Sequence, residues 1–184
     1  MQIQQDVLPA VRSMKDFDKA LEADQEMIVL LETRLTQLKS MVAYLKRAGK
    51  KALIHVDLIQ GLKADEYGLE YLLREVKPDG ILSTRGNVIK LAKKQKLLAI
   101  QRMFLLDSAA LEQNVKLIER IQPDCVEVLP GLMPRVIRQI HDETGLPIIA
   151  GGLIRTEEEA HAALNAGAVA VSTSKRELWK MQYS

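Results

Sequence analysis

Short apolar runs alternate with segments of helical spacing along the whole of this 184-residue chain. The apolar runs are residues 7–11, 27–31, 52–58, 81–84, 97–104, 125–129, 147–153 and 168–174. A segment with good helix formers follows each run, and no linker or change of composition interrupts the series. Near-continuous apolar strands alternating with helices are typical of a parallel sheet buried on both faces. Eight such units predict a single α/β domain over residues 1–184, closed into a small (β/α)8 TIM-like barrel of parallel strands.

The main alternative architecture is an open, doubly wound sheet. That fold would carry a glycine-rich turn after its first strand, whereas residues 9–12 of this chain read Pro-Ala-Val-Arg. An internal echo also favours repeated units, because residues 76–81 (VKPDGI) resemble residues 121–126 (IQPDCV). Both stretches lead into an even-numbered strand of the predicted barrel, so we prefer the closed architecture.

Composition indicates the compartment and the kinds of partner expected for such a barrel. Hydrophobic residues make up 47% of the chain, which is enough for one large core, and the net charge of +2 does not by itself indicate a nucleic-acid partner. The one cysteine excludes an internal disulfide and fits a reducing compartment. The N-terminus lacks the apolar core of a signal peptide, and no apolar run reaches membrane-spanning length. We therefore expect a cytoplasmic protein without membrane contact.

The last two predicted strands end in small residues that suit a bound anion. Gly151 and Gly152 close the seventh strand, and Ser172 and Thr173 close the eighth. In many (β/α)8 barrels the turns after strands seven and eight hold a phosphate. Glycine lets the backbone approach an anion closely, and the helix N-terminus that follows offers unpaired N–H groups. These four residues are our predicted phosphate site, with ordinary strand-to-helix connections as the alternative.

Charged residues in other strands are predicted to reach the same mouth of the barrel. Period-two alternation places His55 and Asp57 inside, because the apolar residues between them suit the surrounding helices. The same logic places Glu127 and Arg102 inside. Charges in a barrel interior are costly unless they are paired or used. We therefore predict that these four residues form a ligand site, in which the carboxylates could accept hydrogen bonds from sugar-like or glycerol hydroxyls, with purely structural ion pairs as the alternative.

The same residue types permit other kinds of chemistry. The carboxylates and His55 could hold Mg²⁺ or Mn²⁺, but their spacing is not a metal signature, so we predict no metal. A Schiff-base enzyme needs a lysine at the end of a strand, whereas Lys50, Lys51 and Lys96 precede strands. General acid–base catalysis on a phosphorylated substrate, as in an isomerase or a synthase, stays open.

A basic helix face is the candidate nucleic-acid contact. Lys90, Lys93 and Lys94 share one face of the helix expected over residues 87–95. Such faces are usually only solvated, but this one has the charge to contact a phosphate backbone. Aromatic residues make up only 4% of the chain, so we expect any nucleic-acid contact to depend on charge and shape rather than on an aromatic stacking platform.

Six motifs follow one another along the chain at consistent spacing. They are residues 55–62 (HVDLIQGL), 77–84 (KPDGILST), 101–108 (QRMFLLDS), 123–131 (PDCVEVLPG), 148–154 (IIAGGLI) and 171–174 (VSTS), the last followed by Leu178-Trp179. Together they resemble the glycerol-3-phosphate-responsive antiterminators, also called glycerol uptake operon antiterminator regulatory proteins. The resemblance covers nearly the whole chain. Two positions depart from it: residues 31–33 replace an expected Thr-Gly-like turn, and Lys96 replaces an expected glycine.

The resemblance implies a bacterial regulator without catalytic activity and without a cofactor. Such a protein would sense glycerol 3-phosphate as its effector and bind the leader of mRNAs for glycerol catabolism. It would thereby permit read-through of a terminator and stabilise the transcript. On this interpretation Gly151, Gly152, Ser172 and Thr173 bind the phosphate, the inward charged residues bind the glycerol end, and the lysines of residues 90–94 contact RNA. A homo-oligomer is left open.

Overall fold

The computed structural model describes residues 2–181 and 183 and contains a closed barrel of eight parallel strands. The strand order around the barrel is β1-β10-β9-β8-β7-β6-β4-β2. These strands are β1 (Val7–Val11), β2 (Met27–Leu30), β4 (Lys51–His55), β6 (Gly80–Ser83), β7 (Leu98–Phe104), β8 (Cys125–Leu129), β9 (Ile148–Gly151) and β10 (Ala168–Thr173). All eight predicted strands are confirmed. The third ends at His55, three residues before its predicted end, and this difference matters at the site.

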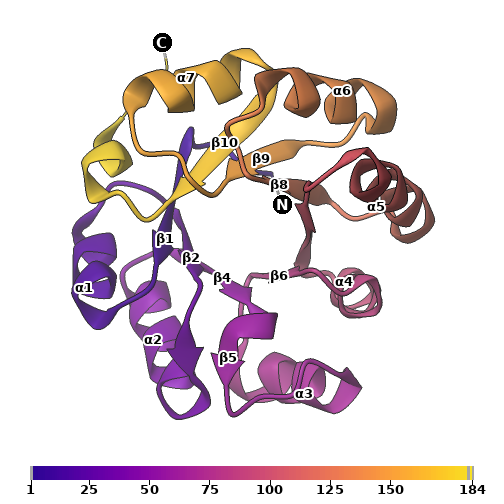
Figure 1. Ribbon diagram of the computed structural model, residues 1–184. Helices are drawn as coiled ribbons and strands as arrows, with labels where there is room; N and C mark the ends of the chain where they lie inside the picture. Colours follow the sequence, from indigo (N-terminus) through magenta and orange to yellow (C-terminus); the bar gives the residue numbers. More distant parts are fainter. Residues whose placement is uncertain (1, 182, 184) are drawn as a thin grey trace.

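Helices surround the barrel in chain order (Figure 1). They are α1 (Met14–Glu22), α2 (Leu35–Arg47), α3 (Glu66–Tyr71), α4 (Gly86–Lys94), α5 (Ser108–Ile121), α6 (Pro134–Thr144) and α7 (Glu157–Asn165). A π-helical turn, η2 (Leu72–Val76), extends α3, and a 3-10 helix, η3 (Arg176–Lys180), stands in the place of an eighth α-helix. These short elements explain how so short a chain completes a barrel. Within the described residues no helix is both long and apolar enough to cross a membrane.

Loops at the C-terminal mouth of the barrel carry a second, smaller sheet. Strand β3 (Thr33–Arg34) pairs in parallel with β5 (Ile59–Gln60), which follows the 3-10 turn η1 (Val56–Leu58). The pair links the connection after β2 to the connection after β4. This link connects two loops on one side of the mouth, where residues 31–33 replace the Thr-Gly-like turn expected from the resemblance.

Two apolar clusters reflect the alternation along the strands. The barrel interior is filled by Leu8, Met27, Val29, Leu53, Leu82, Leu98, Ile100, Cys125, Ile149 and Ala170, with Ile3 packed against them. The alternate positions, such as Ile54, Val126 and Val128, join the larger cluster between barrel and helices. The interior is therefore a packed core, and a ligand can enter only above it, at one mouth.

The similar stretches at residues 76–81 and 121–126 form the same pattern of hydrogen bonds. Asp79 accepts a hydrogen bond of 2.9 Å from the N–H of Ala52, and Asp124 accepts one of 2.9 Å from Ala99. The N–H of each aspartate donates in turn to the carbonyl of the same alanine, also at 2.9 Å. Each aspartate thus joins two neighbouring strands at their N-terminal ends, opposite the mouth.

Lys96 shows why a glycine is expected at its position. Its φ of 62° lies in the left-handed region, which costs a residue with a side chain roughly 1–2 kcal/mol. The residue sits between α4 and β7, at the N-terminal end of the barrel. This departure from the family pattern therefore lies at the far end of the barrel from the candidate site.

Candidate functional site

A cleft of about 700 Å³ opens at the C-terminal mouth of the barrel. Its wall comes from the ends of strands β1, β7, β8 and β10, from the 3-10 turn after β4, and from the loops after β1, β2, β8, β9 and β10. The charged residues of the wall are Arg12, Glu32, Arg102, Glu127, Arg155 and Lys175. Leu31, Leu58, Phe104, Leu129 and Leu153 supply apolar surface. The cleft lies where a (β/α)8 barrel carries its functional groups.

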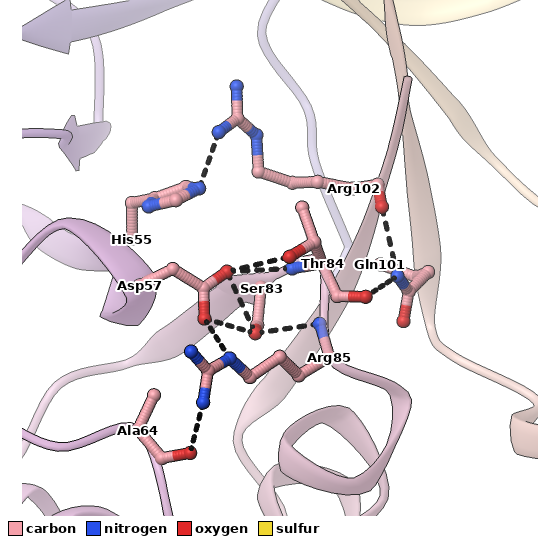
Figure 2. A network of polar contacts seen from close by, with 8 residues as sticks. All are labelled: His55, Asp57, Ala64, Ser83, Thr84, Arg85, Gln101 and Arg102. Atoms are coloured by element: carbon pink, nitrogen blue, oxygen red, sulfur yellow. Dashed lines mark hydrogen bonds and ion pairs between the residues drawn. The ribbon is translucent and has the colours of Figure 1, made fainter. Parts of the chain in front are cut away.

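A chain of four polar side chains crosses the barrel interior at the floor of this cleft. Ser172 Oγ donates to Glu127 Oε1 at 2.5 Å, and Arg102 Nε donates to Glu127 Oε2. Arg102 Nη1 also donates to His55 Nε2 (Figure 2). The side chains of Glu127 and Arg102 are 2% and 10% exposed, so this ion pair is nearly dry. The predicted inward orientation of His55, Arg102 and Glu127 is confirmed.

His55 is a neutral member of this network at physiological pH. Burial, and then the positive charge of Arg102, lower the pKa of His55 from 6.5 to about 4. A neutral ring that accepts at Nε2 must carry its proton on Nδ1, and this buried atom has no hydrogen-bond partner among the described residues. His55 thus acts as an acceptor that orients Arg102.

Gly151 makes room for the network. A Cβ atom at this position would lie 2.6 Å from Glu127 Oε1 and 2.7 Å from Ser172 Oγ, too close for either atom to stay in place. Gly151 is buried within β9, and the cleft is lined instead by Gly152, whose φ is 73°. The predicted glycine pair therefore divides into two roles: Gly151 leaves space for the carboxylate, and Gly152 forms the turn that faces the cleft.

The hydroxyl groups of Ser172 and Thr173 line the cleft as predicted, but their protons are already used. Ser172 donates to Glu127, and Thr173 Oγ1 donates to the carbonyl of Ile154 at 3.0 Å and accepts from the N–H of Lys175 at 3.1 Å. A phosphate needs donors, and the Glu127 carboxylate beside Ser172 would repel it. These two residues therefore shape the site more readily than they bind an anion.

Backbone N–H groups at the N-terminus of α7, beyond the glycine turn, also already have hydrogen-bond acceptors. Thr156 and Glu159 form a capping box on α7, in which each side chain satisfies a backbone N–H of the other residue. Glu159 additionally accepts from the N–H of Arg155 at 2.7 Å. The expected anion site at this helix end is thus occupied by the chain's own carboxylate.

Two cations at the cleft were not predicted from the sequence. Arg155 and Lys175 are exposed at the cleft wall, and within residues 2–181 and 183 no carboxylate lies within ion-pair distance of either. Arg12, by contrast, is paired with Glu32 at 2.6 Å. The sequence signal was present, because Arg155 and Lys175 follow the two predicted phosphate turns within three residues. Both carry N–H donors of a kind that the two hydroxyl groups do not have available.

Asp57 does not join the inward network, and its predicted position is wrong. It lies in η1, where its carboxylate accepts from Ser83 Oγ at 2.9 Å and from the N–H of Thr84 at 2.8 Å, and it lies 3.6 Å from Arg85 Nε (Figure 2). It is not part of the cleft wall. The period-two argument failed because the strand ends at His55, two residues earlier. Asp57 ties η1 to the end of β6.

The predicted lysine face on α4 is only partly available to a partner. Lys90, Lys93 and Lys94 are all exposed, and none lines the cleft. Lys93 Nζ, however, donates to the carbonyl of Gln122 and lies 3.7 Å from Asp124. It therefore connects α4 to the start of β8, and of the three lysines only Lys90 and Lys94 have no carboxylate partner within the described part of the chain.

Lys50, one of the lysines that the sequence places before a strand, lies far from the mouth as expected. Lys50 Nζ donates to the carbonyls of Ala23 and Gln25 at the N-terminal end of the barrel. Lys175 is the lysine at a strand end that sequence reasoning overlooked, but it is exposed and lacks the apolar burial that activates a Schiff-base lysine. Among the described residues, no group of three or more His, Cys, Asp or Glu side chains is placed to hold a metal ion.

Comparisons with known proteins agree on one family. The family model described as glycerol-3-phosphate responsive antiterminator matches residues 7–179. A crystal structure of a glycerol uptake operon antiterminator regulatory protein from Listeria monocytogenes is 47% identical, with a TM-score of 0.94 over 97% of this chain and 96% of that one. A glycerol uptake operon antiterminator-related protein from Thermotoga maritima is 35% identical, with a TM-score of 0.86 over 96% of this chain and 99% of that one. The uncharacterized protein YgcP of Escherichia coli (strain K12) is 35% identical over 178 residues, which are 97% of this chain and 93% of that protein.

Proposed function

The chain belongs to the glycerol-3-phosphate responsive antiterminator family, and from this premise we propose that it binds glycerol 3-phosphate in the cleft and leader mRNA of glycerol-catabolism operons in response. Binding of the leader permits read-through of a terminator and stabilises the transcript. The protein acts as a regulator without catalysis and without a cofactor. The observation that carries the proposal is that two cations without a carboxylate partner among the described residues meet a buried polar network of Arg102, Glu127 and Ser172 in one cleft.

The phosphate group is assigned to the outer part of the cleft. Arg155 and Lys175 line the cleft together with the turn at Gly152, so a phosphate bound there would receive charge-assisted hydrogen bonds from both cations. Neither cation has to give up a carboxylate partner to bind it. The predicted residues Ser172 and Thr173 form the wall behind this position, with their own hydroxyl protons directed into the protein.

The glycerol end is assigned to the floor of the cleft. Arg102 uses Nε and Nη1 within the network, which leaves its second amino group, Nη2, to donate to a ligand oxygen. Glu127 and Ser172 retain lone pairs that can accept from a ligand hydroxyl. A hydroxyl group both donates and accepts, so it matches this mixed floor. His55 contributes by holding Arg102, not by touching the ligand.

Ligand binding is tested by titrating the protein with glycerol 3-phosphate. Trp179 is the single tryptophan, and its Nε1 donates at 2.9 Å to the carbonyl of Thr173 beside the cleft, so its fluorescence should report binding.

Removing either cation, as Arg155→Gln or Lys175→Gln, should weaken binding about 10-fold or more, because a hydrogen bond to a charged group contributes roughly 1.5–3 kcal/mol. Lys90→Gln on α4 is the matched control. Wild-type affinity in both cleft variants would place the phosphate elsewhere.

RNA binding is tested separately, by gel-shift titration of a leader RNA with and without glycerol 3-phosphate at several salt concentrations. We expect tighter binding with the ligand and an affinity that falls as salt rises. No binding under either condition would contradict the regulatory proposal.

An enzyme acting on a small phosphorylated substrate, such as an isomerase or a synthase, is the second candidate. It is favoured by one observation, the buried carboxylate of Glu127 in the cleft wall. Against it, Glu127 already accepts two hydrogen bonds, and the lowered pKa of His55 makes that ring a weak base at neutral pH. Incubation of the protein with glycerol 3-phosphate and related phosphometabolites, followed by NMR, distinguishes the two, because turnover would support the enzyme.

A further inference from the structure

The mouth of the barrel exposes apolar side chains that the proposed ligand does not need. Leu58, Phe104 and Leu153 line the cleft with 40%, 50% and 57% of their surface exposed. Leu106, 87% exposed, continues this rim two residues beyond Phe104. Exposed large apolar side chains beside a polar site are often part of a site of interaction.

Glycerol 3-phosphate would leave part of the cleft wall uncovered. The cleft volume of about 700 Å³ lies within the usual range of small-molecule sites, so the side chains that the ligand would leave uncovered matter more than the size. Glycerol 3-phosphate has hydroxyl groups and a phosphate but no flat or apolar face to cover Phe104. When it sits at Arg155, Lys175 and the buried floor, the part of the cleft lined by Leu58 and Phe104, which we call its apolar half, stays open.

Taking the proposed function as its basis, we propose that the leader RNA docks on this mouth and inserts one unpaired base into the apolar half of the cleft, stacked on Phe104. Unpaired bases stack on aromatic side chains whatever their sequence, because every base has a π face. The guanidinium of Arg102 lies 5.5 Å from the centre of the Phe104 ring and holds the ring by a cation–π contact. The small number of aromatic residues does not oppose this inference, since one well-placed ring is enough for one base.

The charge of the rim fits RNA better than an apolar protein partner. Arg34, just before α2, and Arg135, in the first turn of α6, are exposed at this end of the barrel. Within the described part of the chain neither has a carboxylate within ion-pair distance, so both are free to meet phosphates flanking the inserted base. Phosphate contacts position an RNA, and the stacked base anchors it.

Sharing one cleft couples the two binding events without a change of fold. The ligand fills the polar half and completes the floor on which the base rests, and the base covers the ligand and excludes water from its hydrogen bonds. Each partner then raises the affinity of the other, by the same factor in both directions. The lysine face of α4 lies outside the cleft, so contacts by Lys90 and Lys94 would add salt-sensitive affinity without this coupling.

The test compares Phe104→Ala, Phe104→Trp and the double variant Lys90→Gln/Lys94→Gln. Phe104 is half exposed, so the alanine variant should fold, as a thermal melt will show. We expect Phe104→Ala to bind leader RNA about 5- to 100-fold more weakly in the presence of ligand. Its affinity for glycerol 3-phosphate in calorimetry should fall by a much smaller factor, because Phe104 contacts Arg102 but offers the small ligand no polar group. The ratio of RNA affinities with and without ligand should fall towards one. Phe104→Trp should restore both quantities.

Three results would overturn the inference, and they can be told apart. If Phe104→Ala binds RNA like the wild type while the double lysine variant does not, the RNA lies on α4. If Phe104→Ala weakens glycerol 3-phosphate binding itself to the same extent, the apolar wall belongs to the small ligand. If the wild-type protein binds no leader RNA with or without ligand, the proposed function fails first and the docking surface with it.

Discussion

Replacing Glu127 by glutamine should destabilise the protein far more than the same change in an exposed ion pair. The substitution keeps the size of the side chain but removes its charge, and it leaves the Arg102 guanidinium, 10% exposed, beside a neutral amide. Breaking a buried pair from one side costs about 3–5 kcal/mol. The amide oxygen can still accept one hydrogen bond from Arg102, so we expect the lower end of this range, about 3 kcal/mol. For a chain of this length that corresponds to a fall in Tm of about 6–12 °C.

The measurement is urea unfolding followed by fluorescence of Trp179, a buried residue that should become solvated when the chain unfolds. The control is Glu70→Gln, which removes the charge from the exposed pair of Glu70 with Arg74, 2.9 Å apart and one helical turn away in sequence. We expect this variant to lose about 0.5 kcal/mol or less, because solvent screens such pairs. Equal losses in both variants, or a loss below about 1 kcal/mol for Glu127→Gln, would refute the argument from desolvation.

A double variant separates stability from function at the same site. Replacing both charges, as Arg102→Met/Glu127→Leu, removes the unpaired ion and should recover much of the lost stability, since apolar replacements of a buried pair are often neutral. It also removes the floor that we assign to the glycerol hydroxyls, so glycerol 3-phosphate binding should be abolished. A stable double variant that still binds the ligand would show that the network is structural only.

Three further outcomes are expected. Because burial and a neighbouring guanidinium hold the pKa of His55 at about 4 instead of 6.5, only the unfolded chain gains a proton between these values, and stability should fall by on the order of 3 kcal/mol as pH drops from 6.5 to 4. Urea titrations should show this slope flattened in His55→Asn but kept in His141→Asn, a change at an exposed position of α6. Gly151→Ala places a methyl group 2.6 Å from Glu127 Oε1, so we expect a loss of about 1–3 kcal/mol and weaker ligand binding in calorimetry, and wild-type affinity would argue against the tight packing at this point. Lys96→Gly relieves a left-handed backbone with φ of 62° and should raise stability by about 1 kcal/mol in thermal melts, with no gain as the contrary result.

The barrel could be predicted because its information is local. Each strand is a short apolar run, each helix has its own period and caps, and eight such units leave few ways to bury every strand on both faces. The same local information located the mouth and three of its four inward side chains. It failed at Asp57, because periodicity does not say where a strand stops, and the chain turns into η1 after His55.

The sequence by itself determined the architecture, the family and the two turns around which the cleft is built. Only the tertiary structure decided which hydrogen-bond donors, acceptors and charges in that cleft remain available to a ligand. It directs the Ser172 proton to Glu127, leaves Arg155 and Lys175 without carboxylate partners in the described chain, and brings Phe104 to the cleft wall. The physical reason is that hydrogen-bond capacity and free charge depend on neighbours far apart in the chain, such as residues 127 and 172, which local periodicity does not record.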